Sequence, residues 1–157
     1  MKNLKDIAWA VMFGVVSMGA PSVWAQAGAH TMVTLGDLKW VEVPSLPPGA
    51  KLAVIEGQQV KQPQYTLRIK FPADYKLPAH WHPAIERVTV ISGTFNLGTG
   101  DKLDTEKTKA LTPGSTAIIQ PMTNHFAWTS EETVIQLHGR GALDIHYVNP
   151  EDDPRKK

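Results

Sequence analysis

Hydrophobic and polar residues alternate along most of this 157-residue chain, in short runs that turn residues separate. Val, Ile, Thr and aromatic residues dominate the runs, whereas Gly, Pro, Asn and Asp dominate the gaps. A period of two is typical of β-strands, because successive side chains of a strand point to opposite faces. The pattern predicts ten strands, over residues 38–43, 51–56, 65–71, 77–82, 86–91, 94–97, 115–119, 125–128, 133–138 and 143–148.

Turn signals lie between these runs. Pro-Pro-Gly at 47–49 and Pro-Gly at 113–114 are typical of turns, and Ser-Gly at 92–93 is typical of a hairpin. Beyond the N-terminal segment, only residues 104–110, a charged insertion, favour a helical turn. Many short strands in one domain predict an all-β fold, either a sandwich or a barrel.

The first 25 residues predict an export signal. Lys2 and Lys5 give a basic start, and residues 7–20 form an apolar stretch. Small residues precede a cut after Ala25, and a cut after Ala27 fits nearly as well. The alternative, an uncleaved membrane anchor, is disfavoured because the apolar stretch is shorter than the roughly 20 residues of a membrane span. We therefore expect a periplasmic or secreted protein.

This signal sets the predicted domain boundaries. We expect a signal peptide over residues 1–25, a single domain over 26–148 and a C-terminal tail over 149–157. The tail is charged and contains prolines, so we expect it to be loose. The ~130 residues that follow the signal are enough for one hydrophobic core and too few for two.

Charge and cysteine content narrow the range of functions. The chain has 16 basic and 15 acidic residues, and cleavage would remove two lysines and one aspartate, which leaves no net charge. This balance gives no reason to expect nucleic acid or an anionic membrane as a partner. The sequence contains no cysteine, which excludes disulfides, thiolate ligands and cysteine nucleophiles.

Four side chains predict a metal site: His80, His82, Glu86 and His125. The first two histidines are two residues apart on a predicted strand, so both imidazoles lie on one face. Glu86 follows a Pro-Ala-Ile bend and shares its strand face with valines, where a lone carboxylate would be costly unless paired or metal-bound. His125 comes from a third strand. Three imidazole nitrogens and one carboxylate oxygen suit a divalent iron, manganese or zinc ion.

The spacing of these residues resembles that of the cupin superfamily, whose members are small jelly-roll β-barrels. The matching residues are His80, His82, Glu86 and Gly93 in the first motif, and Gly114 and His125 in the second. The resemblance covers most of residues 50–148 and implies a single-domain, cupin-type jelly-roll barrel with all four ligand positions intact. The chain also looks like small exported bacterial cupins. This resemblance implies the fold and a metal site but says very little about the substrate.

Four positions depart from the cupin pattern. Asp74 stands where a glycine usually opens the first motif, and aspartate tolerates the left-handed turn conformation better than most residues. Pro121 falls one place late, Met122 takes a glycine position, and Thr129 replaces the closing asparagine. The last three changes surround His125, so its approach to a metal is the least secured of the four.

Gln136 and His138 are the candidate substrate-binding residues. Alternation places them on one face of the strand at 133–138 and places Ile135 and Leu137 on the other. The sequence leaves open which face is the inner one. If the first face is inner, both polar side chains line the same cavity as the metal.

Several functions remain open from the sequence. The first is a metal-dependent enzyme on a small molecule, with dioxygenase, isomerase or lyase chemistry, in which Glu86 is a ligand or detaches to act as the catalytic base. The second is a non-catalytic module that binds a metal or a small ligand. A third is a homodimer with an idle pocket, paired through strands between residues 38 and 71. Tyr65, Arg68 and Arg140 have side chains suited to anionic substrates, but no spacing singles them out.

Overall fold

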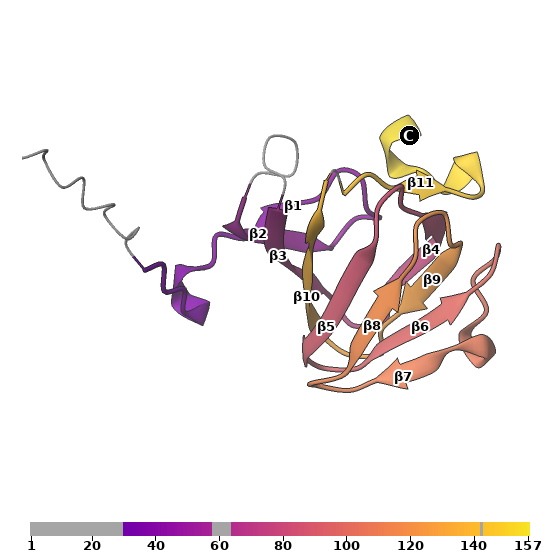
Figure 1. Cartoon of the computed structure of the whole chain (residues 1–157). Coiled ribbons are helices and arrows are strands. Elements are labelled where there is room, and N and C mark those ends of the chain that lie inside the picture. Colours follow the sequence, from indigo (N-terminus) through magenta and orange to yellow (C-terminus); the bar gives the residue numbers. More distant parts are fainter. Residues whose placement is uncertain (1–29, 58–63, 142) are drawn as a thin grey trace, which may run out of the picture. The chain divides into compact units, whose positions relative to one another are not determined.

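The computed structural model describes residues 30–57, 64–141 and 143–157. The chain divides into two units, residues 1–31 and 32–157, and all described strands and helices lie in the second (Figure 1). The predicted signal peptide lies outside the described residues. None of the helices in the described ranges is long and apolar enough to cross a bilayer.

Two antiparallel sheets make up the second unit. The six-stranded sheet contains, in spatial order, β1 (Val41–Glu42), β2 (Lys51–Glu56), β3 (Gln64–Phe71), β10 (Thr133–Arg140), β5 (Glu86–Ser92) and β8 (Thr116–Ile119). The five-stranded sheet contains β11 (His146–Tyr147), β4 (Lys76–Trp81), β9 (His125–Trp128), β6 (Phe95–Thr99) and β7 (Lys109–Leu111).

The chain passes repeatedly from one sheet to the other. It crosses at each step from β3 to β6, and again at each step from β7 to β11. As a result, β10 lies between β3 and β5, and β9 lies between β4 and β6. This is the connectivity of a jelly roll, so the predicted all-β fold of the cupin type is confirmed.

The inner faces of the two sheets enclose one hydrophobic core. Phe71 of β3 and Phe95 of β6 come from opposite sheets and stack with ring centroids 5.7 Å apart. Leu67, Val88 and Leu137 are almost completely buried around them. Burying a side chain of this size contributes roughly 1.5–3 kcal/mol to stability. The core therefore holds the two sheets together and fixes which face of each strand points inward.

The predicted strand bounds agree with the structure to different degrees. Residues 51–56 and 125–128 are strands with the predicted bounds. The strands expected at 38–43 and 143–148 shrink to β1 and β11, of two residues each.

Strand β7 is not predicted by the sequence. Only one of its three residues, Leu111, is buried, so its alternation gives no signal. The helical turn expected at 104–110 is present just before it, as the 3-10 helix η2 (Thr105–Lys107), whose first turn is capped by Asp104.

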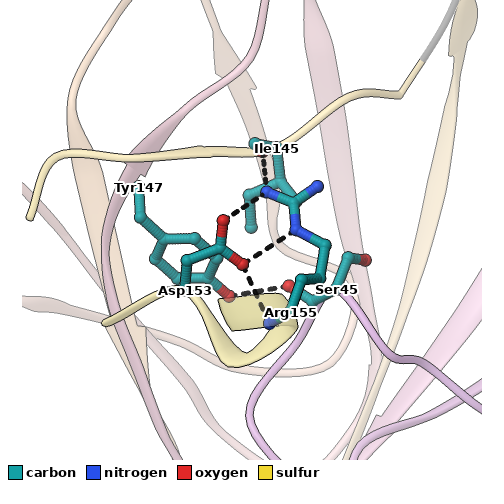
Figure 2. Close-up of polar contacts among 5 residues, drawn as sticks. All are labelled: Ser45, Ile145, Tyr147, Asp153 and Arg155. Atoms are coloured by element: carbon teal, nitrogen blue, oxygen red, sulfur yellow. Dashed lines mark hydrogen bonds and ion pairs between the residues drawn. The ribbon is translucent and has the colours of Figure 1, made fainter. Parts of the chain in front are cut away.

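The C-terminal tail packs against the domain, which corrects the expectation of a loose tail. It forms two 3-10 helices, η3 (Pro150–Asp152) and η4 (Pro154–Lys156). Arg155 donates hydrogen bonds to the carboxylate of Asp153 and to the carbonyl of Ile145 (Figure 2). The two opposite charges pair with each other, so the high charge of this segment does not loosen the tail. We call the group in Figure 2 the C-terminal clamp: Ser45, Ile145, Tyr147, Asp153 and Arg155.

Candidate metal centre

Three buried histidines meet where β4 and β9 pair. His80 of β4 and His125 of β9 are direct partners in the sheet, and His82 lies one residue beyond the end of β4. Their exposed fractions are 2%, 3% and 6% respectively. One ring nitrogen of each lies within 4.8 Å of those of the other two, so the three side chains could hold one metal ion.

A backbone carbonyl orients each imidazole ring. The oxygen partners of the three Nδ1 atoms are Pro78 for His80 (2.8 Å), Asp144 for His82 (2.6 Å) and Thr123 for His125 (2.9 Å). A carbonyl only accepts hydrogen bonds, so in the neutral ring Nδ1 carries the hydrogen and Nε2 keeps a lone pair. Outer contacts of this kind fix the tautomer and orientation of metal-binding histidines.

Glu86 faces two of these nitrogens from the opposite sheet. It is the first residue of β5 and is 7% exposed. Its Oε2 lies 3.2 Å from Nε2 of His125 and 3.7 Å from Nε2 of His82. The structure thus brings together the four side chains that the sequence predicts as a metal site, with Glu86 beside two of the three imidazoles.

Burial shifts the ionisation of this cluster. Burial lowers the pKa of His80 well below its usual value, and the neighbouring His125 and His82 add to the effect. Burial also lowers the pKa of His82, against the opposing influence of Glu86. For Glu86, burial alone would raise the pKa, but the contacts with His125 and His82 outweigh it and hold the pKa below its usual value. The cluster therefore favours neutral His80 and His82 beside an ionised carboxylate, which are the forms that bind metals.

The donor set fits a divalent metal. A neutral Nε2 and a carboxylate oxygen are both acceptors, and two acceptors in close contact repel each other unless a proton or a cation lies between them. Nε2 of His82 is buried and has no hydrogen-bond partner in the described part of the chain. Buried polar atoms rarely stay unpaired. A cation held by the three imidazoles and the carboxylate would satisfy all of these atoms together.

The turn before His125 accommodates the departures from the cupin pattern. Met122, in a position usually occupied by glycine, adopts a left-handed conformation with φ of 62°, and its N–H donates to the carbonyl of His82 at 2.9 Å. Asp74 likewise has a positive φ, 57°, as its residue type allows. The backbone shapes that glycine usually provides are therefore kept, and His125 reaches the cluster.

The cluster forms the polar end of a cavity between the sheets. The cavity has a volume of about 60 Å³, and most of its wall is apolar. Apart from Ser45, the polar side chains that line it are the three histidines and Glu86. A cavity with apolar walls and a few convergent polar groups is typical of a small-molecule site. This volume suits a ligand of only a few heavy atoms.

Gln136 and His138 do not line this cavity, which corrects the expectation that they contact a substrate there. On β10 the cavity is lined by Ile135 and Leu137. Gln136 instead accepts a hydrogen bond from Nε of Arg68 at 3.3 Å on the outer face, and His138 is exposed. Alternation alone cannot tell the two faces of a strand apart; the register of β10 against its neighbours decides.

Sequence reasoning did not find the backbone carbonyls that orient the rings. The carbonyl of Asp144, which holds His82, comes from a segment 62 positions further along the chain. No residue type marks such a contact, because any residue has a carbonyl. The segment is recognisable only after folding, when its neighbours Leu143 and Ile145 line the cavity.

Comparison with known proteins agrees with this architecture. The polyketide cyclase RemF from Streptomyces resistomycificus superimposes with a TM-score of 0.65 and 16% identity, over 82% of this chain and 92% of that one. An RmlC-like cupin from Shewanella frigidimarina gives a TM-score of 0.58 and 16% identity, over 74% and 95%. An RmlC-like cupin from Ralstonia eutropha gives 0.60 and 16%, over 80% and 76%. At these identities the likeness concerns the fold alone.

The family assignment comes from the sequence itself. Among curated proteins, none matches the chain. The profile of the ChrR cupin-like domain, by contrast, matches residues 28–144, which include all four side chains of the centre. The chain therefore belongs to the ChrR cupin-like domain family, within the cupin superfamily.

Proposed function

We propose that this protein binds one divalent metal through His80, His82, His125 and Glu86 and acts as a metal-dependent enzyme on a small molecule. The observation that carries the proposal is the unpartnered, buried Nε2 of His82 beside a carboxylate. The hydrogen bonds from Nδ1 to backbone carbonyls also support the proposal, because they leave the lone pair of each neutral ring on Nε2.

Iron, manganese or zinc fit the donors best. Imidazole nitrogen and carboxylate oxygen are the ligands these ions share, and the chain has no thiolate that would select a softer metal. When bound, such an ion would supply Lewis-acid chemistry, or redox chemistry in the case of iron, at an atom of the substrate.

The chain's own residues would bind and position the substrate. The apolar wall excludes water and strengthens electrostatic interactions at the polar end. Glu86 is ionised and buried, so it can accept a proton from a substrate held beside it, in addition to its role as a ligand. These properties support dioxygenase, isomerase or lyase chemistry. The predicted signal over residues 1–25 supports a location in the periplasm or outside the cell. One similar structure, RemF, is named as a polyketide cyclase, which supports small-molecule chemistry on this fold.

One observation favours a second candidate, a non-catalytic module that binds a metal or small ligand. The described residues that line the cavity include no lysine, arginine, aspartate or tyrosine, and Glu86 is the one carboxylate among them. An enzyme that needs separate acid and base groups would have to obtain one of them from elsewhere. Turnover of a substrate by the metal-loaded protein would decide between the two candidates.

The test compares metal content between matched variants. The purified full-length chain should contain one equivalent of metal by elemental analysis, and His82→Ala should contain almost none. His138→Ala is the control, because it removes an exposed histidine from the outer face and should retain the full equivalent. Equal metal content in the wild type and His82→Ala would refute the proposed centre. A screen for dioxygen uptake and substrate turnover with the same three proteins then tests catalysis.

A further inference from the structure

Tyr65 carries a buried hydroxyl that no described residue satisfies. The side chain is 3% exposed, and its hydroxyl has no hydrogen-bond partner in the described part of the chain. The other two tyrosines differ: the hydroxyl of Tyr75 donates to the carbonyl of Pro47 at 2.7 Å, and that of Tyr147 donates to the carbonyl of Ser45 at 2.8 Å. An unpaired buried hydroxyl reduces stability, so its presence calls for a partner that the described residues do not supply.

The register of the six-stranded sheet places Tyr65 in the same row as Glu86, the carboxylate of the metal centre. Tyr65 of β3 pairs with Gly139 of β10. On the other side of β10, His138 pairs with Arg87, so Gly139 comes level with Glu86, the next residue of β5. The three residues thus form one row across the sheet, with glycine in the middle.

Gly139 leaves the space that the phenol fills. A Cβ atom at this glycine would lie 2.5 Å from the hydroxyl oxygen of Tyr65 and 2.8 Å from its Cζ. The ring therefore lies across the backbone of Gly139 and carries its hydroxyl toward β5, the strand of Glu86. Leu137 is the last residue of β10 that lines the cavity wall. Gly139 and its partner Tyr65 lie one inward-facing row further along the sheet, level with Glu86.

The hydroxyl is a donor under ordinary conditions. Burial raises the pKa of Tyr65 to about 12, and the charge of Glu86 acts in the same direction. The phenol therefore keeps its proton at neutral pH and needs an acceptor. A divalent metal with imidazole and carboxylate ligands also prefers an oxygen atom as its additional ligand.

We propose that Tyr65 is a ligand-binding residue of the centre, whose hydroxyl donates a hydrogen bond to an oxygen of a small carbonyl or oxyanion compound bound beside Glu86. This inference rests on the proposed metal site. It goes beyond that site by assigning a donor from a third strand, and by selecting ligands whose oxygen can be shared between the metal and the phenol.

The experiment uses the cobalt-loaded protein and acetohydroxamate, whose two oxygens bind metals. Cobalt binding is measured first, and the hydroxamate is then titrated while the visible spectrum of cobalt is followed. Tyr65→Phe should bind cobalt as tightly as the wild type and acetohydroxamate roughly tenfold more weakly, as expected for one lost hydrogen bond. Its melting temperature should equal or exceed that of the wild type, since the removed hydroxyl has no partner among the described residues.

Tyr75→Phe is the matched control. It removes a buried hydroxyl that does have a protein partner, so it should lower the melting temperature and leave the hydroxamate affinity unchanged. Gly139→Ala keeps the hydroxyl but displaces the ring, and it should weaken hydroxamate binding as Tyr65→Phe does.

The outcomes separate this inference from the proposed function. If the wild type binds no cobalt, the metal site fails and the role of Tyr65 fails with it. If cobalt binds but the hydroxamate does not, or binds the wild type and Tyr65→Phe equally, the metal site stands and the role of Tyr65 is overturned. A lower melting temperature for Tyr65→Phe would also overturn it, because the hydroxyl would then have a structural partner.

Discussion

The metal centre and the C-terminal clamp are both clusters of polar side chains, but they differ in whether their polar atoms have hydrogen-bond partners. In the clamp, Arg155 donates to both carboxylate oxygens of Asp153, at 2.8 and 2.9 Å, and to the carbonyl of Ile145. In the metal centre, the Glu86 carboxylate lies 3.7 Å from Nε2 of His82, a buried atom with no hydrogen-bond partner in the described part of the chain. The polar atoms of the clamp therefore find partners within the clamp, whereas those of the metal centre need a further atom as a partner.

The difference separates groups that stabilise the fold from groups that bind something. Buried polar networks stabilise a structure when every member has a partner, and a partly satisfied network costs free energy. A natural chain keeps such a cost mainly where function requires it. The two clusters are also connected, because Ile145 of the clamp follows Asp144, whose carbonyl orients His82.

The largest effect is expected for a substitution that weakens metal binding but gives the histidines a hydrogen-bond donor. Glu86→Gln replaces the carboxylate with an amide that can donate to a histidine Nε2. The metal-free variant should therefore melt at a higher temperature than the metal-free wild type, and its metal affinity should fall by at least about 100-fold, more than outer contacts usually cost. Calorimetric unfolding and metal titration measure the two effects. A variant that loses both stability and affinity would show that Glu86 serves the fold instead.

The second prediction concerns pH. The pKa values of His80 and His82 are lowered in the folded state, so below about pH 6.5 the unfolded chain binds protons that the folded chain does not. The metal-free protein should lose up to about 1.4 kcal/mol of stability per pH unit for each histidine as the pH falls. Glu86, whose pKa is also lowered, adds a loss of the same sign below about pH 4.3. Metal occupancy should fall over the same range.

Chemical denaturation between pH 7 and pH 5 measures this effect. His138→Ala should follow the wild-type curve, because His138 is exposed. A stability that stays constant over this range, or undiminished metal occupancy below pH 5, would contradict the assignment of neutral, buried imidazoles.

The smallest expected effect tests the connection between the clusters. Arg155→Ala removes the bonds to Asp153 and Ile145 and should cost about 1 kcal/mol of stability, since the guanidinium is partly exposed. Because Ile145 adjoins the carbonyl that orients His82, metal affinity should also fall, by less than the roughly tenfold lower end of outer-contact effects. Lys156→Ala, an exposed neighbour, is the control. Unchanged affinity at reduced stability would mean that the clamp serves only the fold.

Part of this picture could be predicted from the sequence. The fold follows from alternation, and the four side chains of the centre follow from spacing together with the cupin resemblance. Alternation separates the two faces of a strand but does not show which face points to the core. The inner face of β10 and the positions of Gln136 and His138 therefore could not be derived from it. The tail is another case: Asp153 and Arg155 look like ordinary surface charges until the fold brings Ile145 within reach.

Tyr65 shows a third limit. Its residue type suggests substrate binding, but its importance depends on the absence of a side chain at Gly139, a residue 74 positions away with which it shares a row of the sheet. Such a pairing has no local signal. It follows only from strand order and register, which long-range packing decides.

The placement of the four metal-site side chains on two sheets has a mechanical consequence. His80 and His125 lie on β4 and β9 of the five-stranded sheet and His82 directly follows β4, whereas Glu86 is the first residue of β5 in the six-stranded sheet. An ion held by all four would act as a cross-brace between layers that no disulfide joins, because the chain lacks cysteine. Its binding energy would then count toward folding, so that the metal-loaded protein would unfold at a higher temperature than the metal-free protein.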